Sequence, residues 1–135
     1  MKKVLFICRY NRYRSQIAAG LFNKYCPKNI ATGKSAGLIQ GQSVGKEVKQ
    51  YAKLNKIKIT KPKGMVRDIV NKQDIFVLVA NDVPPSIFTR YKKYGKKVIV
   101  WKIKDINETK DRDFTRTNSM IKNKVVSLID SLKNY

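Results

Sequence analysis

Short runs of consecutive apolar residues, separated by segments with helical periodicity, constrain the fold of this chain more than any other feature. The clearest runs lie within residues 4–7, 74–80 and 97–101, and residues 30–36 could form a further strand that Gly37 closes. A continuous apolar run of this length is typical of a strand that is buried on both faces. Strands that alternate with helices form a parallel sheet with helices on both sides. We therefore expect an α/β fold.

The segments between these runs predict helices. Apolar residues recur at helical spacing over residues 15–25, 44–54 and 118–132, and more weakly over 66–70. A further helix is expected to follow Pro85 and to reach Tyr94, where Gly95 would end it. Residues 103–115 are polar without a regular pattern, so we expect a loop. Ligand-binding loops should lie at the carboxyl ends of the parallel strands.

Length and hydropathy narrow the class of protein. A chain of 135 residues, 42% of them hydrophobic, is suited to one folded domain. Its apolar runs are far shorter than the roughly 18 residues of a membrane span, so no membrane partner is expected. The apolar run at the N-terminus is interrupted by Arg9 and is too short for a signal peptide. We therefore expect a cytoplasmic protein.

The sequence contains no histidine and two cysteines, Cys8 and Cys26. Without histidine, Ser-His-Asp and Cys-His catalysis and most zinc enzymes are excluded. Two cysteines are too few for a disulfide scaffold. Any nucleophile in this chain must be activated without an imidazole, and we expect no metal and no cofactor.

The charge balance is strongly basic. Thirty lysines and arginines against nine acidic residues give a formal net charge of +21, which attracts polyanions such as nucleic acid or phosphorylated substrates. Lys46, Lys49, Lys53 and Lys56 recur at a spacing of three or four residues and would form one basic helix stripe. No nucleic-acid-binding motif accompanies them. The excess of lysine is equally compatible with background composition.

Residues 8–15, which we call the Cys8 loop, contain most of the candidate catalytic and binding residues. They read Cys-Arg-Tyr-Asn-Arg-Tyr-Arg-Ser and join the first predicted strand to the first predicted helix. Backbone N–H groups in such a loop can surround an anion, and the helix dipole adds positive potential. Cys8 would then be favoured as a thiolate, the nucleophilic form. Arg14 could grip two phosphoryl oxygens, and Ser15 could donate a hydrogen bond to the sulfur.

These parts are sufficient for nucleophilic catalysis through a phosphocysteine. The remaining loop residues are expected to bind substrate together with Ser15: Arg9, Tyr10, Asn11, Arg12 and Tyr13. Two roles are open for Arg9 and Arg12, namely recognition of a second anionic group or salt bridges to the acidic region 105–113. The simpler alternative for the whole loop is a buried cysteine at the end of a strand, followed by a basic surface loop.

The sequence resembles the low-molecular-weight protein tyrosine phosphatase family. The matching residues are Val-Leu-Phe-Ile-Cys8, Asn11, Arg14-Ser15, Ala18, Leu21-Phe22, Ser35-Ala36-Gly37 and Asn81-Asp82. The resemblance implies a single three-layer domain over residues 1–135, with a four-stranded parallel sheet flanked by helices on both faces. It also implies hydrolysis of phosphomonoesters without a metal, with phosphotyrosine as the default substrate.

The same resemblance implies an aspartate as general acid in the loop after the fourth strand, a place that Asp105 occupies. The residues themselves agree, because Asp105 follows a strand that should end beside the Cys8 loop. Asp82, Asp111 and Asp113 are alternatives. The family usually has proline after this aspartate, and this chain has isoleucine.

Other departures from the family pattern concern the cysteines and the loop. Tyr13 stands where many members have a second cysteine, and Cys26 is expected to pack at the end of the first helix. Thioredoxin-coupled arsenate reduction needs cysteines later in the chain, and none follows Cys26. Tyr10 replaces a glycine that is common before Asn11. A phosphoarginine or small-metabolite phosphatase, and a basic binding module without catalysis, are the alternative functions.

Overall fold

The computed structural model describes residues 1–92 and 94–134. Its strands are β1 (Lys2–Cys8), β2 (Ala31–Gly37), β3 (Ile75–Val79) and β4 (Lys97–Trp101). Its helices are α1 (Arg14–Tyr25), α2 (Lys46–Leu54), α3 (Arg67–Asn71), the 3-10 turn η1 (Pro85–Phe88), α4 (Thr89–Lys92) and α5 (Asp111–Lys133).

The four strands form one parallel sheet in the order β2-β1-β3-β4. Cys8 pairs with Gly37 on one side of the sheet, and Val79 pairs with Trp101 on the other. The carboxyl ends of all four strands therefore lie along one edge, which brings the loops that follow them together. The predicted four-stranded α/β fold is confirmed.

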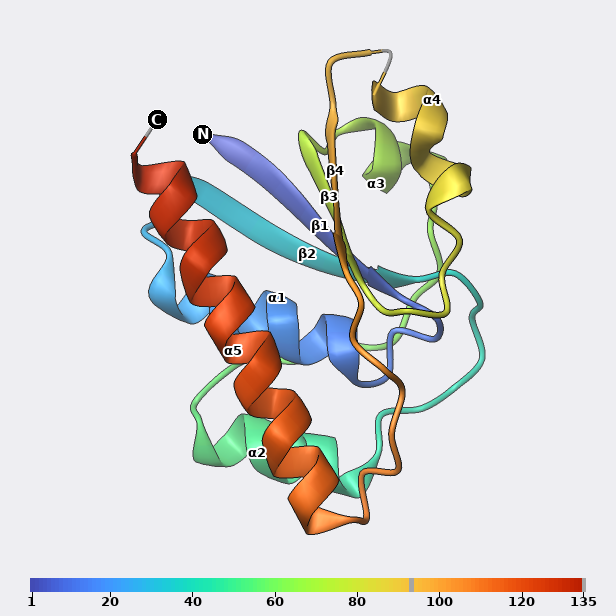
Figure 1. The fold of residues 1–135 in the computed structure, drawn as a ribbon, viewed down its shortest axis with the longest axis vertical. Coiled ribbons are helices and arrows are strands. Elements are labelled where there is room, and N and C mark those ends of the chain that lie inside the picture. Colours follow the sequence, from blue (N-terminus) through green and yellow to red (C-terminus); the bar gives the residue numbers. More distant parts are fainter. Residues whose placement is uncertain (93, 135) are drawn as a thin grey trace.

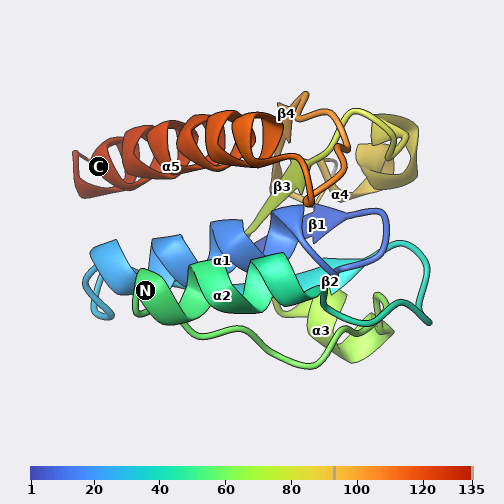
Figure 2. The ribbon, with the colours of Figure 1, turned by 90° about the horizontal axis from the view of Figure 1, so that it is seen from below.

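Alternating side chains of β1 divide the core into two layers. Val4 and Phe6 pack with residues of α1, α2 and α5, whereas Leu5 and Ile7 pack with residues of α3 and η1. Figure 1 shows these helix groups on opposite sides of the sheet, and Figure 2 shows α1 between α2 and α5. Because both faces are covered, the two central strands are apolar and buried over residues 4–8 and 75–79, as the sequence pattern predicted.

The predicted helix from Pro85 to Tyr94 is replaced by two short elements. The chain makes the 3-10 turn η1 and continues into α4, which is described as far as Lys92, and residue 93 of the predicted helix lies outside the described residues. Phe88 anchors this region, because its ring lies 5.7 Å from that of Phe76 on β3. Pro84 and Pro85 lack backbone N–H donors, and the one buried residue of these elements is Phe88, so little apolar surface supports a longer helix.

The last helix begins at Asp111, whereas the sequence pattern predicted 118–132, so the expected loop 103–115 was partly wrong. Asp111 and Asp113 lie in the first turn of α5, where the helix dipole favours negative charge. The ring of Phe114 packs 5.4 Å from that of Tyr13. These residues supply a helix start that an apolar stripe alone does not reveal.

The predicted basic stripe on α2 is shorter than expected. The helix ends at Leu54, and Lys56 lies beyond it with a positive φ of 54°. Lys46, Lys49 and Lys53 remain on the helix and are exposed. In the part of the chain that the structure describes, no helix has both the length and the apolar character needed to cross a membrane.

Candidate active site

The nucleophile candidate lies where the sheet meets the first helix. β1 ends at Cys8, and α1 begins at Arg14. Cys8 Sγ and Ser15 Oγ are 3.0 Å apart, and Asn11 Nδ2 donates to the same Oγ at 2.8 Å. While Ser15 Oγ accepts from Asn11, its own hydrogen is free to be donated to the sulfur when Cys8 is a thiolate. The arrangement therefore stabilises a thiolate at Cys8 by a charge-assisted hydrogen bond.

The loop reverses direction at Asn11, whose φ is +57°. Asparagine tolerates this left-handed conformation better than most residues. Among the described residues other than glycine, only Asn11 and Lys56 have a positive φ. Tyr10 therefore keeps an ordinary backbone conformation in the loop. A Cβ at Gly37 would lie 2.6 Å from the Tyr10 carbonyl carbon and 2.7 Å from Asn11 N. Glycine at the end of β2 is therefore needed for close packing of the loop.

Gln16 joins the Cys8 loop to residues 60–63. Its Nε2 donates to Asn11 O at 3.1 Å and to Thr60 O at 2.8 Å, and its Oε1 accepts from Thr60 N at 2.9 Å. Lys63 N donates to Asn11 Oδ1 at 3.1 Å. The sequence analysis missed Gln16. Its signal was a polar residue next to the apolar stripe of the first helix, directly after Ser15.

Arg14 is 3% exposed and is held by two partners. Its Nη1 donates to Ile103 O at 2.8 Å, and its Nη2 lies 3.0 Å from Asp82 Oδ1. These contacts come from the segments that follow β4 and β3. Its Nε has no hydrogen-bond partner among the described residues, so this donor is available to a ligand.

A pocket of about 140 Å³ collects the candidate residues at the carboxyl edge of the sheet. It is lined by Cys8, Tyr10, Arg12, Tyr13, Arg14, Gln42 and Asp105. Asp105 thus shares a pocket with the cysteine, whereas Asp82 pairs with Arg14. Asp111 lines a separate pocket of about 390 Å³ between α2 and α5.

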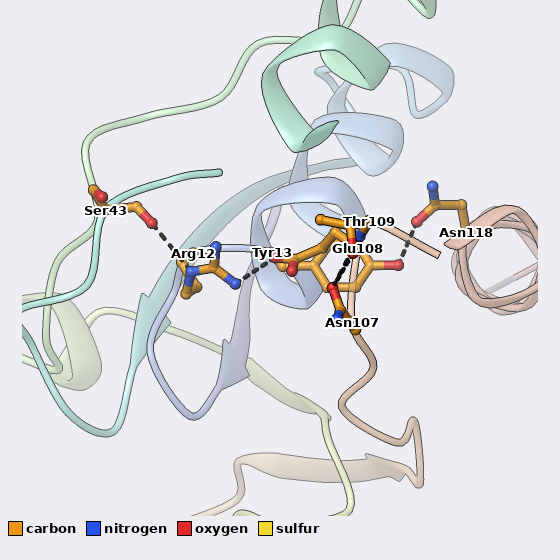
Figure 3. A network of polar contacts seen from close by, with 7 residues as sticks. All are labelled: Arg12, Tyr13, Ser43, Asn107, Glu108, Thr109 and Asn118. Atoms are coloured by element: carbon orange, nitrogen blue, oxygen red, sulfur yellow. Dashed lines mark hydrogen bonds and ion pairs between the residues drawn. The ribbon is translucent and has the colours of Figure 1, made fainter. Parts of the chain in front are cut away.

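Arg12 is bound within the protein. Its Nη1 forms an ion pair with Glu108 Oε1, and its Nε donates to Ser43 O at 3.1 Å (Figure 3). Of the two roles that the sequence left open for this arginine, the salt bridge to region 105–113 is present. Arg9 differs, because its side chain is exposed and its guanidinium lies 5.5 Å from the centre of the Tyr10 ring. The sequence analysis named the acidic region 105–113 as a possible partner of Arg12 but did not single out Glu108 within it.

Tyr13 anchors the loop to α5. Its side chain is 2% exposed, and its hydroxyl donates to Asn118 Oδ1 at 2.7 Å (Figure 3). Burial raises the pKa of Tyr13 well above its ordinary value, and the nearby Glu108 carboxylate raises it further. The hydroxyl therefore remains a neutral donor and serves a structural bond.

The second cysteine does not belong to the pocket. Cys26 follows the last residue of α1, is buried, and its Sγ contacts Pro27 O at 3.6 Å. Burial raises the pKa of its thiol, which favours the unreactive neutral form. Cys26 packs with the core layer of α1 and α5, and Cys8 packs with the other layer.

A comparison with protein families bears directly on this site. Residues 3–135 match the model of the family described as low molecular weight phosphotyrosine protein phosphatase. The chain belongs to this family. It is therefore a phosphatase of a class that transfers the phosphoryl group through a cysteine.

Solved structures extend the likeness of this phosphatase across nearly the whole fold. A low molecular weight phosphotyrosine phosphatase from Vibrio cholerae O395 has a TM-score of 0.83 at 15% identity, covering 98% of this chain and 97% of its own. The YwlE arginine phosphatase from Geobacillus stearothermophilus has a TM-score of 0.80 at 18% identity, with 99% and 94% covered. An arsenate reductase from Archaeoglobus fulgidus has a TM-score of 0.76 at 24% identity, with 94% and 98% covered.

These identities are low enough that the likeness establishes the fold alone. The three proteins carry three different described activities on that fold, so a substrate does not follow from it. A comparison with curated proteins finds no match. The substrate of this phosphatase must therefore be inferred from its own residues.

Proposed function

We propose that this phosphatase hydrolyses phosphotyrosine in proteins without a metal, with Cys8 as nucleophile, Arg14 as phosphoryl ligand and Asp105 as general acid. The observation that carries the proposal is the shared pocket of these three residues, in which Ser15 is hydrogen-bonded to the Cys8 sulfur. No imidazole is needed, because the serine hydroxyl and the amides at the helix start stabilise the thiolate.

In the first step, the Cys8 thiolate attacks phosphorus and forms an S–P bond. The bond from phosphorus to the leaving oxygen breaks, and Asp105 gives its proton to that oxygen. The charge on the phosphoryl oxygens is balanced by Arg14 and by the backbone N–H groups of residues 9–14, the part of the loop that leads into α1.

In the second step, water attacks the phosphocysteine. Asp105, now a carboxylate, takes a proton from this water, an O–P bond forms, and the S–P bond breaks. The sulfur leaves as a thiolate that again accepts a hydrogen bond from Ser15. The products are inorganic phosphate and the free enzyme, so protons balance over the cycle.

The role proposed for Asp105 rests on its position among four candidate aspartates. Its side chain is exposed at the mouth of the pocket that contains Cys8. Asp82 is occupied by Arg14, and Asp111 lies at the α2–α5 pocket. A proton donor must reach the leaving oxygen, and this pocket is where that oxygen would lie.

An aryl substrate is favoured by the aromatic rim of the pocket. Tyr10 and Tyr13 line it, and Tyr10 is half-buried with Arg9 over its ring. A phosphotyrosine ring could pack against the Tyr10 ring while its phosphate occupies the Cys8 loop. Exposed Arg9 could contact an acidic residue of the substrate protein. Phosphoarginine and small phosphate esters are tested as alternatives.

We also propose a cytoplasmic location, because the mechanism needs Cys8 as a reduced thiol, and reducing compartments keep thiols in that form. Both cysteines are free in this fold. Nucleic-acid binding is not proposed, because no feature of the described surface beyond its lysines supports it.

The experiment is a comparison of phosphotyrosine peptides, phosphoarginine peptides and small phosphate esters, with and without a chelator. The proposal expects turnover of aryl phosphates that the chelator does not change. The Cys8→Ser variant should fold, bind phosphate and lose about 10³-fold or more of the rate. Metal-dependent turnover, or turnover that survives in Cys8→Ser, would contradict the mechanism. A preference for phosphoarginine would keep the mechanism and change the substrate.

A further inference from the structure

The segment that carries Asp105 touches the Cys8 loop on both sides of this aspartate. This Asp105 segment, residues 102–110, connects β4 to α5 and contains neither helix nor strand. On its N-terminal side, Arg14 Nη1 donates to Ile103 O at 2.8 Å. On its C-terminal side, Arg12 forms an ion pair with Glu108. Two arginines of one loop therefore hold the two ends of a short span around Asp105.

Glu108 is the better defined of these two anchors. It is 8% exposed, and a carboxylate removed from water to this extent needs a charged partner. Asn107 Oδ1 accepts from Thr109 N at 3.0 Å and from Thr109 Oγ1 at 2.7 Å, forming a tight turn around Glu108 (Figure 3). The turn fixes the backbone from which the Glu108 side chain reaches Arg12.

Arg12 is fixed independently of Glu108. Its Nε donates to Ser43 O at 3.1 Å. A Cβ at Gly45 would lie 2.9 Å from Arg12 Nη2, so the guanidinium packs closely over this glycine. The arginine therefore presents Nη1 to Glu108 from a restrained position, which makes it a rigid anchor for the Asp105 segment.

We propose that Arg12 and Glu108 are positioning residues, which hold Asp105 over the Cys8 pocket for proton transfer. The proposal rests on the function proposed above. Asp105 itself is exposed, and its segment lacks a ladder of backbone hydrogen bonds. The ion pair, three residues after Asp105, therefore limits how far the carboxyl can move from the leaving oxygen. Loss of the pair should weaken proton transfer more than phosphoryl binding.

The test is the leaving-group dependence of kcat/KM for a series of aryl phosphates. Glu108→Gln keeps the side-chain shape and removes the charge. It should lower turnover of poor leaving groups by about ten- to a hundredfold, because small misplacements of a catalytic group cost factors of this size. The loss should be smaller for activated leaving groups, which need little protonation. Asp113→Asn, a matched loss of a carboxylate in the first turn of α5, should leave the dependence unchanged.

Coupling between the two residues distinguishes positioning from general damage. Arg12→Gln, Glu108→Gln and the double variant should show the same leaving-group dependence, because each removes one shared interaction. The reversed pair, Arg12→Glu with Glu108→Arg, should recover part of the lost rate. Additive losses, or a loss in Glu108→Gln that is equal for all leaving groups, would overturn the proposal.

Backbone NMR order parameters of the wild-type protein and Glu108→Gln separate this inference from the proposed function. The order parameters of residues 104–109 should fall in the variant, whereas those of α1 should not change. Unchanged order parameters over 104–109 would overturn the inference whatever the activity. If the wild-type protein showed no Cys8-dependent turnover, the proposed function would fail, and the order parameters would still decide whether the ion pair holds the segment.

Discussion

The Cys8 loop and the Asp105 segment face each other across one pocket but are held in different ways. Cys8, Asn11, Arg14 and Ser15 are at most 3% exposed, and their side chains bond to one another or to neighbouring elements. Asp105 is exposed on a span without regular structure. The proposed nucleophile and phosphoryl ligand are therefore fixed by the core of the fold, and the proposed acid is held by two side-chain anchors.

Single substitutions in the two regions should therefore affect different sets of substrates. Changes in the Cys8 loop alter groups that many contacts determine, so they should affect every substrate. Changes in the Asp105 segment should affect the substrates that need a proton for departure.

Arg14→Lys should cause the largest loss that is common to all substrates, about 10²–10³-fold in kcat. A lysine keeps the charge but cannot contact Asp82, Ile103 O and a phosphoryl oxygen with one planar fork. The loss should be similar for all leaving groups. Steady-state kinetics with Arg116→Lys, an exposed arginine of α5, provides the control. Near-normal turnover in Arg14→Lys would show that the loop does not grip the phosphoryl group.

Asp105→Asn should show the opposite pattern. General acid catalysis contributes about 10²–10⁴-fold, and this contribution matters most for poor leaving groups. A plot of rate against leaving-group pKa should therefore be much steeper for the variant than for the wild-type protein. Asp111→Asn and Asp113→Asn should keep the wild-type slope. An equal loss for all substrates in Asp105→Asn would assign this residue a structural role.

Gly37→Ala should displace the backbone of the Cys8 loop. The added Cβ would meet backbone atoms of Tyr10 and Asn11 at 2.6 and 2.7 Å, which cannot move without shifting the loop. We expect a loss of about 1–3 kcal/mol in the free energy of unfolding and reduced turnover of all substrates. Gly64→Ala is the control, since its nearest neighbour would be 3.6 Å away. Equal stability of the two variants would mean that the loop is not tightly packed.

Tyr13→Phe should have the smallest effect. It removes the hydrogen bond to Asn118, which is worth about 1–2 kcal/mol in the free energy of unfolding. Burial raises the pKa of Tyr13 above its ordinary value of 10.0. Above that pH, Tyr13 ionises in the unfolded chain while it stays neutral in the folded protein. The free energy of unfolding therefore falls as pH rises. Chemical denaturation at several alkaline pH values should show a shallower fall in Tyr13→Phe, and an identical fall would contradict the assignment.

The sequence predicted the parts of this molecule that depend on local patterns. The runs at 4–7 and 74–80 became the central strands β1 and β3 because both faces of the sheet are covered, and the run at 97–101 became the edge strand β4. The Cys8 loop was recognisable because Cys8, Arg14 and Ser15 occupy fixed places between a strand and a helix. Both features can be seen in consecutive residues without knowledge of distant contacts.

Long-range contacts could not be predicted in the same way. Arg12 and Glu108 are 96 residues apart, and Tyr13 and Asn118 are 105 apart. A salt bridge of Arg12 to region 105–113 was one of two roles that the sequence left open, but nothing in the sequence distinguishes Glu108 from a solvated loop carboxylate. The start of α5 was missed for a related reason, since Phe114 is the contact that supports its first turns, and its partner Tyr13 belongs to the Cys8 loop. Such pairs become visible only when the sheet brings the segments together.

The most direct test of the central claim is to trap the covalent intermediate. The protein is mixed with an activated aryl phosphate, stopped within the first turnover by denaturant, and digested for mass spectrometry. The mechanism predicts a phosphoryl group on the peptide that contains Cys8, in larger amount for Asp105→Asn, because attack by water is slowed. A phosphoryl group on another residue, or turnover in single-turnover conditions without any phosphorylated peptide, would contradict it.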